Sequence, residues 1–299
     1  MTQNRDRNDT ETRQNCHSRA SGIHNLMVFI IKEILSKRNL IKELVLKDLK
    51  VRYSMPILGF FWAILSPLLA VLIFYVVFSL FLKVNIKEAP FLLYLMSAVF
   101  PWNFFQDSIM RSTASLVDNR NLIRESRFPH YLIPISIILA NVINFLPSLI
   151  ILIICSGLFL KGLPGFIIFL PIVLIIHLII TMGLSIILSV FYVRWRDLKF
   201  ILEPVLLLLF YLTPVFYPLS LVKNSFSPLL FKVYAYNPFV GVLNLYRSAV
   251  LRGFYGFIRE DVGVLPFVIM PFVFAILVFF LGIYLYKKNK NIINDYLSY

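Results

Sequence analysis

Six long stretches of this chain contain no Asp, Glu, Lys or Arg, and they constrain the fold more than any other feature. Each has at least 18 residues, enough for an α-helix to cross a hydrocarbon core of about 30 Å at about 1.5 Å per residue. The stretches are residues 53–82, 89–106, 128–160, 162–193, 204–222 and 262–286. They are continuously apolar, whereas the strands of membrane barrels alternate over about ten residues. The pattern predicts an all-α integral membrane protein with six transmembrane helices, at about residues 57–82, 89–110, 131–160, 165–192, 201–219 and 263–286.

The composition supports a membrane protein. Of the 299 residues, 59% are hydrophobic and 15% are charged, whereas a soluble domain is about one quarter charged. This composition excludes a cytoplasmic enzyme and a disordered protein. The two cysteines, Cys16 and Cys155, are too few for a secreted disulfide scaffold and have no metal-ligand spacing.

A seventh uncharged stretch, residues 233–246, has only 14 residues, which is too few to span a bilayer. We interpret it as part of a re-entrant helical segment on the outer side, in preference to a seventh span. Pro238 favours a helix start there, because its missing N–H falls where the first turn has unpaired donors. We expect the helix to run through Ala249. Arg247 and Arg252, on the outer side, are expected to meet lipid headgroups or a phosphate of a ligand.

The basic residues predict the orientation. If both termini are cytoplasmic, 21 of the 29 Lys and Arg residues lie on the inner side, as the positive-inside rule requires. The net charge of +14 therefore indicates topology and not nucleic-acid binding. Residues 1–36 and 287–299 are expected to be cytoplasmic tails, the first of them without the apolar region of a signal peptide.

Catalytic and cofactor motifs are missing from the sequence. The nearest approach to a P-loop, Gly157 and Gly162, continues into Leu163 instead of Lys. The four histidines are scattered, and His177, deep in an apolar run, is expected to be a neutral structural residue. We therefore predict no catalytic, cofactor-binding or metal-binding residues. If the protein moves a substrate uphill, another chain must supply the energy.

Residues 37–52 form an amphipathic pattern. One helical face is apolar, and the other carries charged residues. Such a helix lies in the membrane interface, with its basic side chains directed towards lipid headgroups. The basic residues assigned to this interface helix are Lys42, Lys47, Lys50 and Arg52. The helix is either a simple anchor or a platform for a cytoplasmic partner.

A short polar segment, residues 119–130, connects the predicted second and third spans. Its basic residues are explained by topology alone, but its apolar residues suit docking into a groove of a partner. The residues assigned to docking are Arg120, Leu122, Ile123, Arg124, Arg127 and Phe128.

Aromatic residues make up 16% of the chain. Many of them are expected to form the interfacial belt: Trp62, Phe100, Trp102, Phe104, Phe105, Tyr217, Tyr234 and Tyr236. Rings that instead face a water-filled path would stack on sugars.

Ordered motifs from about residue 39 onwards resemble the ABC-2-type polysaccharide export permeases, the membrane subunits that export O-antigens, capsules and teichoic acids. The motifs are LVLKDLKVRYSMPILGFFWAILSPLL, FPWNFFQDSI with NRNLIRESRFP, FYVRWRDLKFILEPVLLLLFYLTPVFYP and YNPFVGVLNLYRSAVLRG. The resemblance implies a homodimer of six-span subunits in the bacterial cytoplasmic membrane, bound to two separate nucleotide-binding subunits that hold ATP and Mg.

The resemblance also implies roles for individual segments. Residues 119–130 would be the coupling segment seated in the ATPase, and residues 37–52 the interface helix. A lipid-linked polysaccharide, an O-antigen first among the candidates, would pass between the subunits. The outer gate, residues 233–252, would include Tyr234, Tyr236, Asn237, Pro238, Phe239, Tyr246 and Arg247.

Two alternatives remain open at this point. The first is a membrane-embedded glycosyl- or acyltransferase, for which Asp107, Asp118, Asp197 and Glu203 are the acidic candidates. The second is a passive channel, for which a partner-docking segment has no use.

Overall fold

The computed structural model describes residues 32–53, 56–84, 86, 89–125, 128–256, 263 and 265–298. These residues form helices and connecting turns, and none of them is in a β-strand, so the all-α prediction is confirmed for this part of the chain. The chain divides into two units, Met1–Leu44 and Val45–Tyr299. Helix α2, Arg38–Arg52, begins in the first unit and ends in the second. Its bounds lie within one residue of the predicted amphipathic helix.

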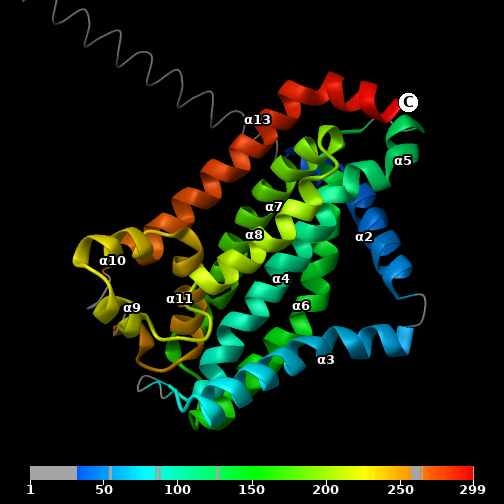
Figure 1. The fold of residues 1–299 in the computed structure, drawn as a ribbon. Coiled ribbons are helices and arrows are strands. Elements are labelled where there is room, and N and C mark those ends of the chain that lie inside the picture. The colour runs from blue at the N-terminus through cyan, green and yellow to red at the C-terminus, as the bar shows by residue number, and fades with distance from the viewer. Residues whose placement is uncertain are drawn as a thin grey trace, which may run out of the picture. The chain divides into compact units, whose positions relative to one another are not determined.

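The larger unit is built on four long helices that pack side by side (Figure 1). They are α4 (Phe91–Asp118), α6 (Leu132–Phe159), α7 (Leu170–Arg194) and α13 (Met270–Ser298). Helix α3, Pro56–Tyr75, continues into a π-helical turn, Val76–Phe81. It lies steeply across α4 and α6 (Figure 1) and packs against both.

Four helical segments among the described residues are long and apolar enough to cross a membrane: Ile64–Phe81, Leu132–Phe159, Gly165–Arg194 and Pro266–Ile293. They correspond to the first, third, fourth and sixth predicted spans. Helix α4, in the place of the second, is long but less apolar, because neighbouring helices enclose it and buried hydroxyl groups such as those of Ser108 and Ser112 are tolerated there. The count of six spans stays a prediction.

The fifth predicted span, 201–219, is longer than the helix that the structure places there. Helix α8 runs from Leu198 to Leu212, 15 residues, which corresponds to about 22 Å of helix. It ends at Thr213, whose backbone is extended (ψ 149°), because the residue before a proline is disfavoured in the helical region. Pro214 thus ends the helix at Leu212, seven residues before the predicted end of the span at residue 219.

Helices α7 and α13 cross at two glycines. A Cβ on Gly183 would lie 2.6 Å from the backbone nitrogen of Phe279, and a Cβ on Gly282 would lie 2.8 Å from the carbonyl oxygen of Gly183. Small residues allow such close approach of backbones, which is a main source of helix association in membranes. The two glycines therefore determine how closely these helices pack.

Three short helices precede the last long one: α9 (Leu219–Ser225), α10 (Pro228–Ala235) and α11 (Pro238–Val250). Helix α11 starts at the predicted proline and ends one residue beyond the predicted Ala249. The side chain of Asn237 caps it by accepting a hydrogen bond of 3.0 Å from the Phe239 amide. Its 13 residues are too few to cross a bilayer, but its re-entrant position stays a prediction.

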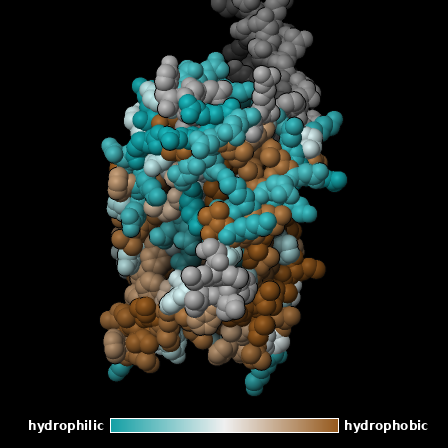
Figure 2. Space-filling model, turned by 90° about the vertical axis from the view of Figure 1, so that its right-hand side faces the viewer, coloured by the Kyte–Doolittle hydropathy of each residue, from teal (hydrophilic) through white to brown (hydrophobic). Residues whose placement is uncertain are grey.

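The segments predicted to be cytoplasmic lie at one end of the larger unit. Helix α5, Arg120–Glu125, packs against α13 beside the C-terminus (Figure 1). Arg194 and Asn289 line one small cavity at the ends of α7 and α13. Hydrophilic residues gather towards one end of the face in Figure 2, and hydrophobic residues towards the other. Within the predicted C-terminal tail, 287–299, α13 continues as a helix to Ser298.

Candidate functional site

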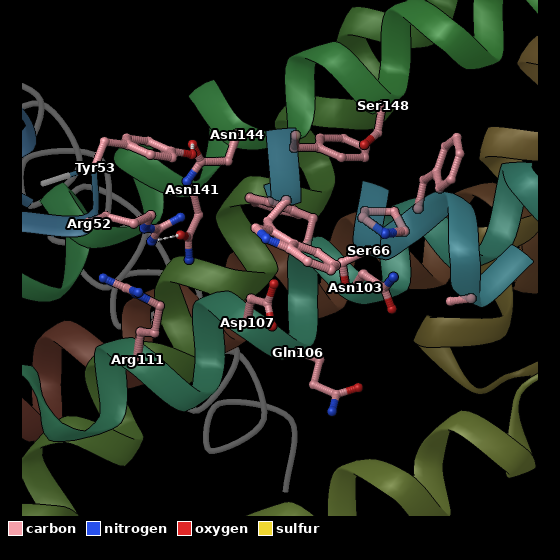
Figure 3. Close-up of a pocket in the computed structure, with 16 residues that line it drawn as sticks. Arg52, Tyr53, Ser66, Asn103, Gln106, Asp107, Arg111, Asn141, Asn144 and Ser148 are labelled. Atoms are coloured by element: carbon pink, nitrogen blue, oxygen red, sulfur yellow. Dashed lines mark hydrogen bonds between the residues drawn. The ribbon is translucent and has the colours of Figure 1, made fainter. Parts of the chain in front are cut away.

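A cavity of about 540 Å³ lies between the end of α2 and helices α3, α4 and α6 (Figure 3). Its polar lining consists of Arg52, Tyr53, Ser66, Asn103, Gln106, Asp107, Arg111, Asn141, Asn144 and Ser148. Its aromatic lining consists of Trp62, Phe100, Phe104 and Phe145. Ser66 and Asp107 remain exposed, so the cavity opens at the surface of the chain.

Helical spacing explains why these side chains meet. On α6, Asn141, Asn144 and Ser148 are three and four residues apart, and residues with this spacing lie on one face of a helix. On α4, Asn103, Asp107 and Arg111 repeat every four residues. Polar side chains inside an apolar stretch mark functional sites in membrane proteins. Asn141 and Asn144 carry this signal in the sequence, since both lie inside the uncharged stretch 128–160.

The end of α2 is held against the cavity by polar contacts. Asp48 pairs with Arg111 at 3.1 Å and with Arg52 at 3.5 Å. Arg52 also donates a hydrogen bond to Oδ1 of Asn141, and the Tyr53 hydroxyl donates one to Oδ1 of Asn144 (Figure 3). Burial lowers the pKa of the Arg52 guanidinium and the charge of Arg111 lowers it further, while Asp48 opposes both effects.

The four basic residues assigned to the interface helix therefore differ in their surroundings. Lys42 and Lys50 are exposed, as a lipid-facing role requires. Lys47 is exposed too, but its Nζ donates a hydrogen bond of 2.8 Å to Oδ1 of Asn119. Arg52 points into the cavity and not towards headgroups, because Asn141 and Asp48 hold its guanidinium.

The structure separates the residues of the predicted coupling segment. Arg120 and Arg124 are exposed on α5, and Leu122 and Phe128 are half-buried. Ile123 is buried in the chain itself, which differs from the expectation that it docks into a partner. Arg127 lies outside the described residues.

The segment is anchored to α13. The His130 amide donates a hydrogen bond of 2.8 Å to the Tyr286 hydroxyl, and the ring of Tyr131 packs edge-on against Tyr286 at 5.3 Å. These two contacts join the C-terminal end of the segment to α13.

Arg247, one of the residues assigned to the outer gate, is buried inside the chain. Arg247 is 0% exposed, and its guanidinium carbon lies 3.5 Å from the ring centre of Tyr94. It donates hydrogen bonds to the Val215 carbonyl at 2.9 Å and to Oδ1 of Asn244 at 3.4 Å. No ion pair with Arg247 occurs in the described part of the chain. The expectation that Arg247 meets headgroups or a ligand phosphate is wrong, because its guanidinium is fully buried and is held by groups of the same chain.

Two tyrosines of the predicted gate also have protein partners. Tyr246 is 0% exposed in the core, where its hydroxyl lies 3.3 Å from Nδ1 of His177. It is a packing residue in the core of this chain, whereas the resemblance assigned it to the outer gate. The Tyr234 hydroxyl lies 3.1 Å from that of Tyr217. Tyr236, 40% exposed, is the more accessible candidate.

Four aromatic residues assigned to the interfacial belt lie in the core of the chain instead. Phe100, Trp102, Phe104 and Phe105 are all buried on α4. Phe239, half-buried at the start of α11, packs against Trp102 and Phe105. The rings of Trp102, Phe105 and Phe239 thus join α4 to α11. Of the four rings on α4, Phe100 and Phe104 line the cavity.

Comparison with known proteins decides the family. The family model described as ABC-2 type transporter matches residues 39–251, which include the cavity, α5 and α11. The chain belongs to the ABC-2 type transporter family. It is 31% identical over 222 residues to the O-antigen export system permease protein RfbA of Myxococcus xanthus, which covers 74% of this chain and 84% of that protein. It is 32% identical over 210 residues to the protein of the same name from Klebsiella pneumoniae, covering 69% and 78% of the two chains. The polysialic acid transport protein KpsM of Escherichia coli is 28% identical over 261 residues, which are 84% of this chain and 93% of KpsM.

Proposed function

We propose that this chain is the membrane-spanning permease subunit of an ATP-driven exporter that moves a lipid-linked polysaccharide across the bacterial cytoplasmic membrane. The observation that carries the proposal is the match, over most of the chain, to relatives named for the transport of two polysaccharides, O-antigen and polysialic acid. Since O-antigen permeases are the relatives of higher identity, an O-antigen is the polymer we propose first.

The energy source in this proposal is a partner ATPase that binds ATP and Mg. The sequence has no P-loop, and the family to which it belongs is one of ABC transporters. The exposed Arg120 and Arg124 on α5 would contact the ATPase. The anchoring of this segment to Tyr286 provides a path from the nucleotide-driven motion to α13.

The proposed assembly is a homodimer with two ATPase subunits and cytoplasmic termini. Only 6% of the residues in the Ile64–Phe81 span are buried inside one chain, compared with 28% to 44% for the other three candidate spans. This span therefore has a large apolar surface for lipid or for a second copy. The clustering of α5, Arg194 and the last turns of α13 at one end supports a single cytoplasmic side.

The test is deletion of the gene and complementation with variants, with surface polysaccharide and co-purified ATPase as readouts. Arg120→Glu with Arg124→Glu should abolish export and reduce ATPase recovery, because the two exposed cations would become anions at the docking site. Lys223→Glu with Lys232→Glu is the matched control, since it makes the same charge change on α9 and α10. This control should retain the ATPase. Normal surface polysaccharide in the deletion strain would refute the proposed function.

A further inference from the structure

We propose that the cavity between α3, α4 and α6 is a binding site for a sugar residue of the transported polymer. This inference rests on the proposed function and adds to it a defined site within a single chain. The cavity volume of about 540 Å³ is within the range of small-molecule sites, about 300–1,000 Å³. Its lining combines aromatic faces with amide and hydroxyl groups (Figure 3).

The aromatic wall has a buried base and one exposed ring. Phe104 and Phe145 are each 4% exposed and stack on each other with ring centres 5.0 Å apart, so they form the apolar base of the cavity between α4 and α6. Trp62 on α3 is 55% exposed although it lines the same cavity. Its ring is therefore uncovered and available to the C–H face of a sugar.

The polar wall supplies groups that both donate and accept hydrogen bonds. Each amide side chain offers an oxygen acceptor and two N–H donors, which match sugar hydroxyls. The Nδ2 atom of Asn144 is buried without a hydrogen-bond partner among the described residues, while its Oδ1 accepts from Tyr53. A small rotation about the broad terminal torsion of Asn144 would direct this donor to an oxygen in the cavity.

The charges around the cavity favour a neutral polyhydroxy ligand over a phosphate. Arg52 and Arg111 contribute two positive charges, but Asp48 bridges both of them and Asp107 adds a second carboxylate. The two cations are thus already compensated. A carboxylate only accepts hydrogen bonds, so the exposed Asp107 suits sugar hydroxyls and repels an anion.

Two neighbouring rings provide a matched test. Phe61 and Trp62 are both 55% exposed on α3, but only Trp62 lines the cavity. In cells that contain the whole transporter, we expect Trp62→Leu to reduce the export rate about tenfold, since a stacking surface is lost. Trp62→Phe should restore most of the rate because it keeps a ring, and Phe61→Leu should have less than about a twofold effect because Phe61 lies outside the lining. Equal effects of Phe61→Leu and Trp62→Leu, at equal amounts of complex, would overturn the inference.

Photo-crosslinking gives a direct readout that does not depend on the export rate. The photoreactive residue p-benzoylphenylalanine replaces Ser66 or Asn103 in the lining, and Ile150 or Ile154 on the exposed face of α6 as controls. During export, the lining positions should form adducts that react with a periodate-based carbohydrate stain, and the controls should form lipid adducts only. Lipid adducts alone from the lining positions, with export intact, would overturn the carbohydrate site but leave the proposed function standing. Surface polysaccharide that does not depend on the chain would overturn both.

Discussion

The close crossing of α7 and α13 makes a quantitative prediction about Gly183. In Gly183→Ala, the new methyl group would lie 2.6 Å from the Phe279 nitrogen and 2.7 Å from the Val278 carbonyl carbon. Both are backbone atoms that no side-chain rotation can move. The two helices must therefore separate by about 1 Å, a gap that loses a quarter to a half of each contact's dispersion energy.

The expected magnitude follows from two opposing effects. Overpacking of this kind reduces the free energy of unfolding by about 1–3 kcal/mol, whereas Ala is a better helix former than Gly by about 1 kcal/mol. Gly157→Ala in α6 is the matched control, because the nearest atom to its Cβ would be a Leu163 side-chain carbon at an ordinary 3.4 Å. Both variants gain the same helix propensity. The difference between them, about 1–3 kcal/mol in favour of Gly157→Ala, therefore measures the packing effect.

The assay is equilibrium unfolding of the purified protein in mixed detergent micelles, followed by circular dichroism. Gly282→Ala should behave like Gly183→Ala, since its Cβ would lie 2.8 Å from the Gly183 oxygen. Equal unfolding midpoints for Gly183→Ala and Gly157→Ala would refute the reasoning, because the helices would then not be in backbone contact in the folded protein.

Three further predictions concern the outer segments and the orientation. Tyr246→Ala should destabilise the protein by about 3 kcal/mol, since it empties a fully buried site, whereas Tyr236→Ala should reduce export at unchanged stability; a comparison of purified yield with surface polysaccharide checks both. Arg247→Met should lower the thermal unfolding temperature, because two buried acceptors lose their donor, and an unchanged temperature would show that the buried arginine does not hold α11 in place. In a variant without native cysteines, a membrane-impermeant maleimide should label Ser225→Cys but not Asn121→Cys in intact cells, and the reverse pattern would contradict cytoplasmic termini.

Local features of the sequence predicted most of the helices. A helix bound is decided by neighbouring residues: Pro238 starts α11, and the apolar stretch 128–160 contains α6, Leu132–Phe159. One large difference, the early end of α8, also has a local cause in Pro214. The predicted span did not end there because it was drawn from the absence of charged residues alone. That criterion ignores the backbone limits that proline imposes on the preceding residue.

The candidate site depended on contacts that no local pattern encodes. Asp48 and Arg111 are 63 positions apart, and Tyr53 and Asn144 are 91 positions apart. The sequence alone determined that this chain is an α-helical membrane protein with an amphipathic helix at about residues 37–52, because hydrophobicity, charge and helical period act over a few turns. Only the tertiary structure decided that Arg52 turns into a cavity, that Ile123 and Tyr246 belong to the core, and that Arg247 is enclosed. The reason is physical: the burial of a side chain depends on which distant helix packs over it, and the same arginine is exposed or buried according to that neighbour.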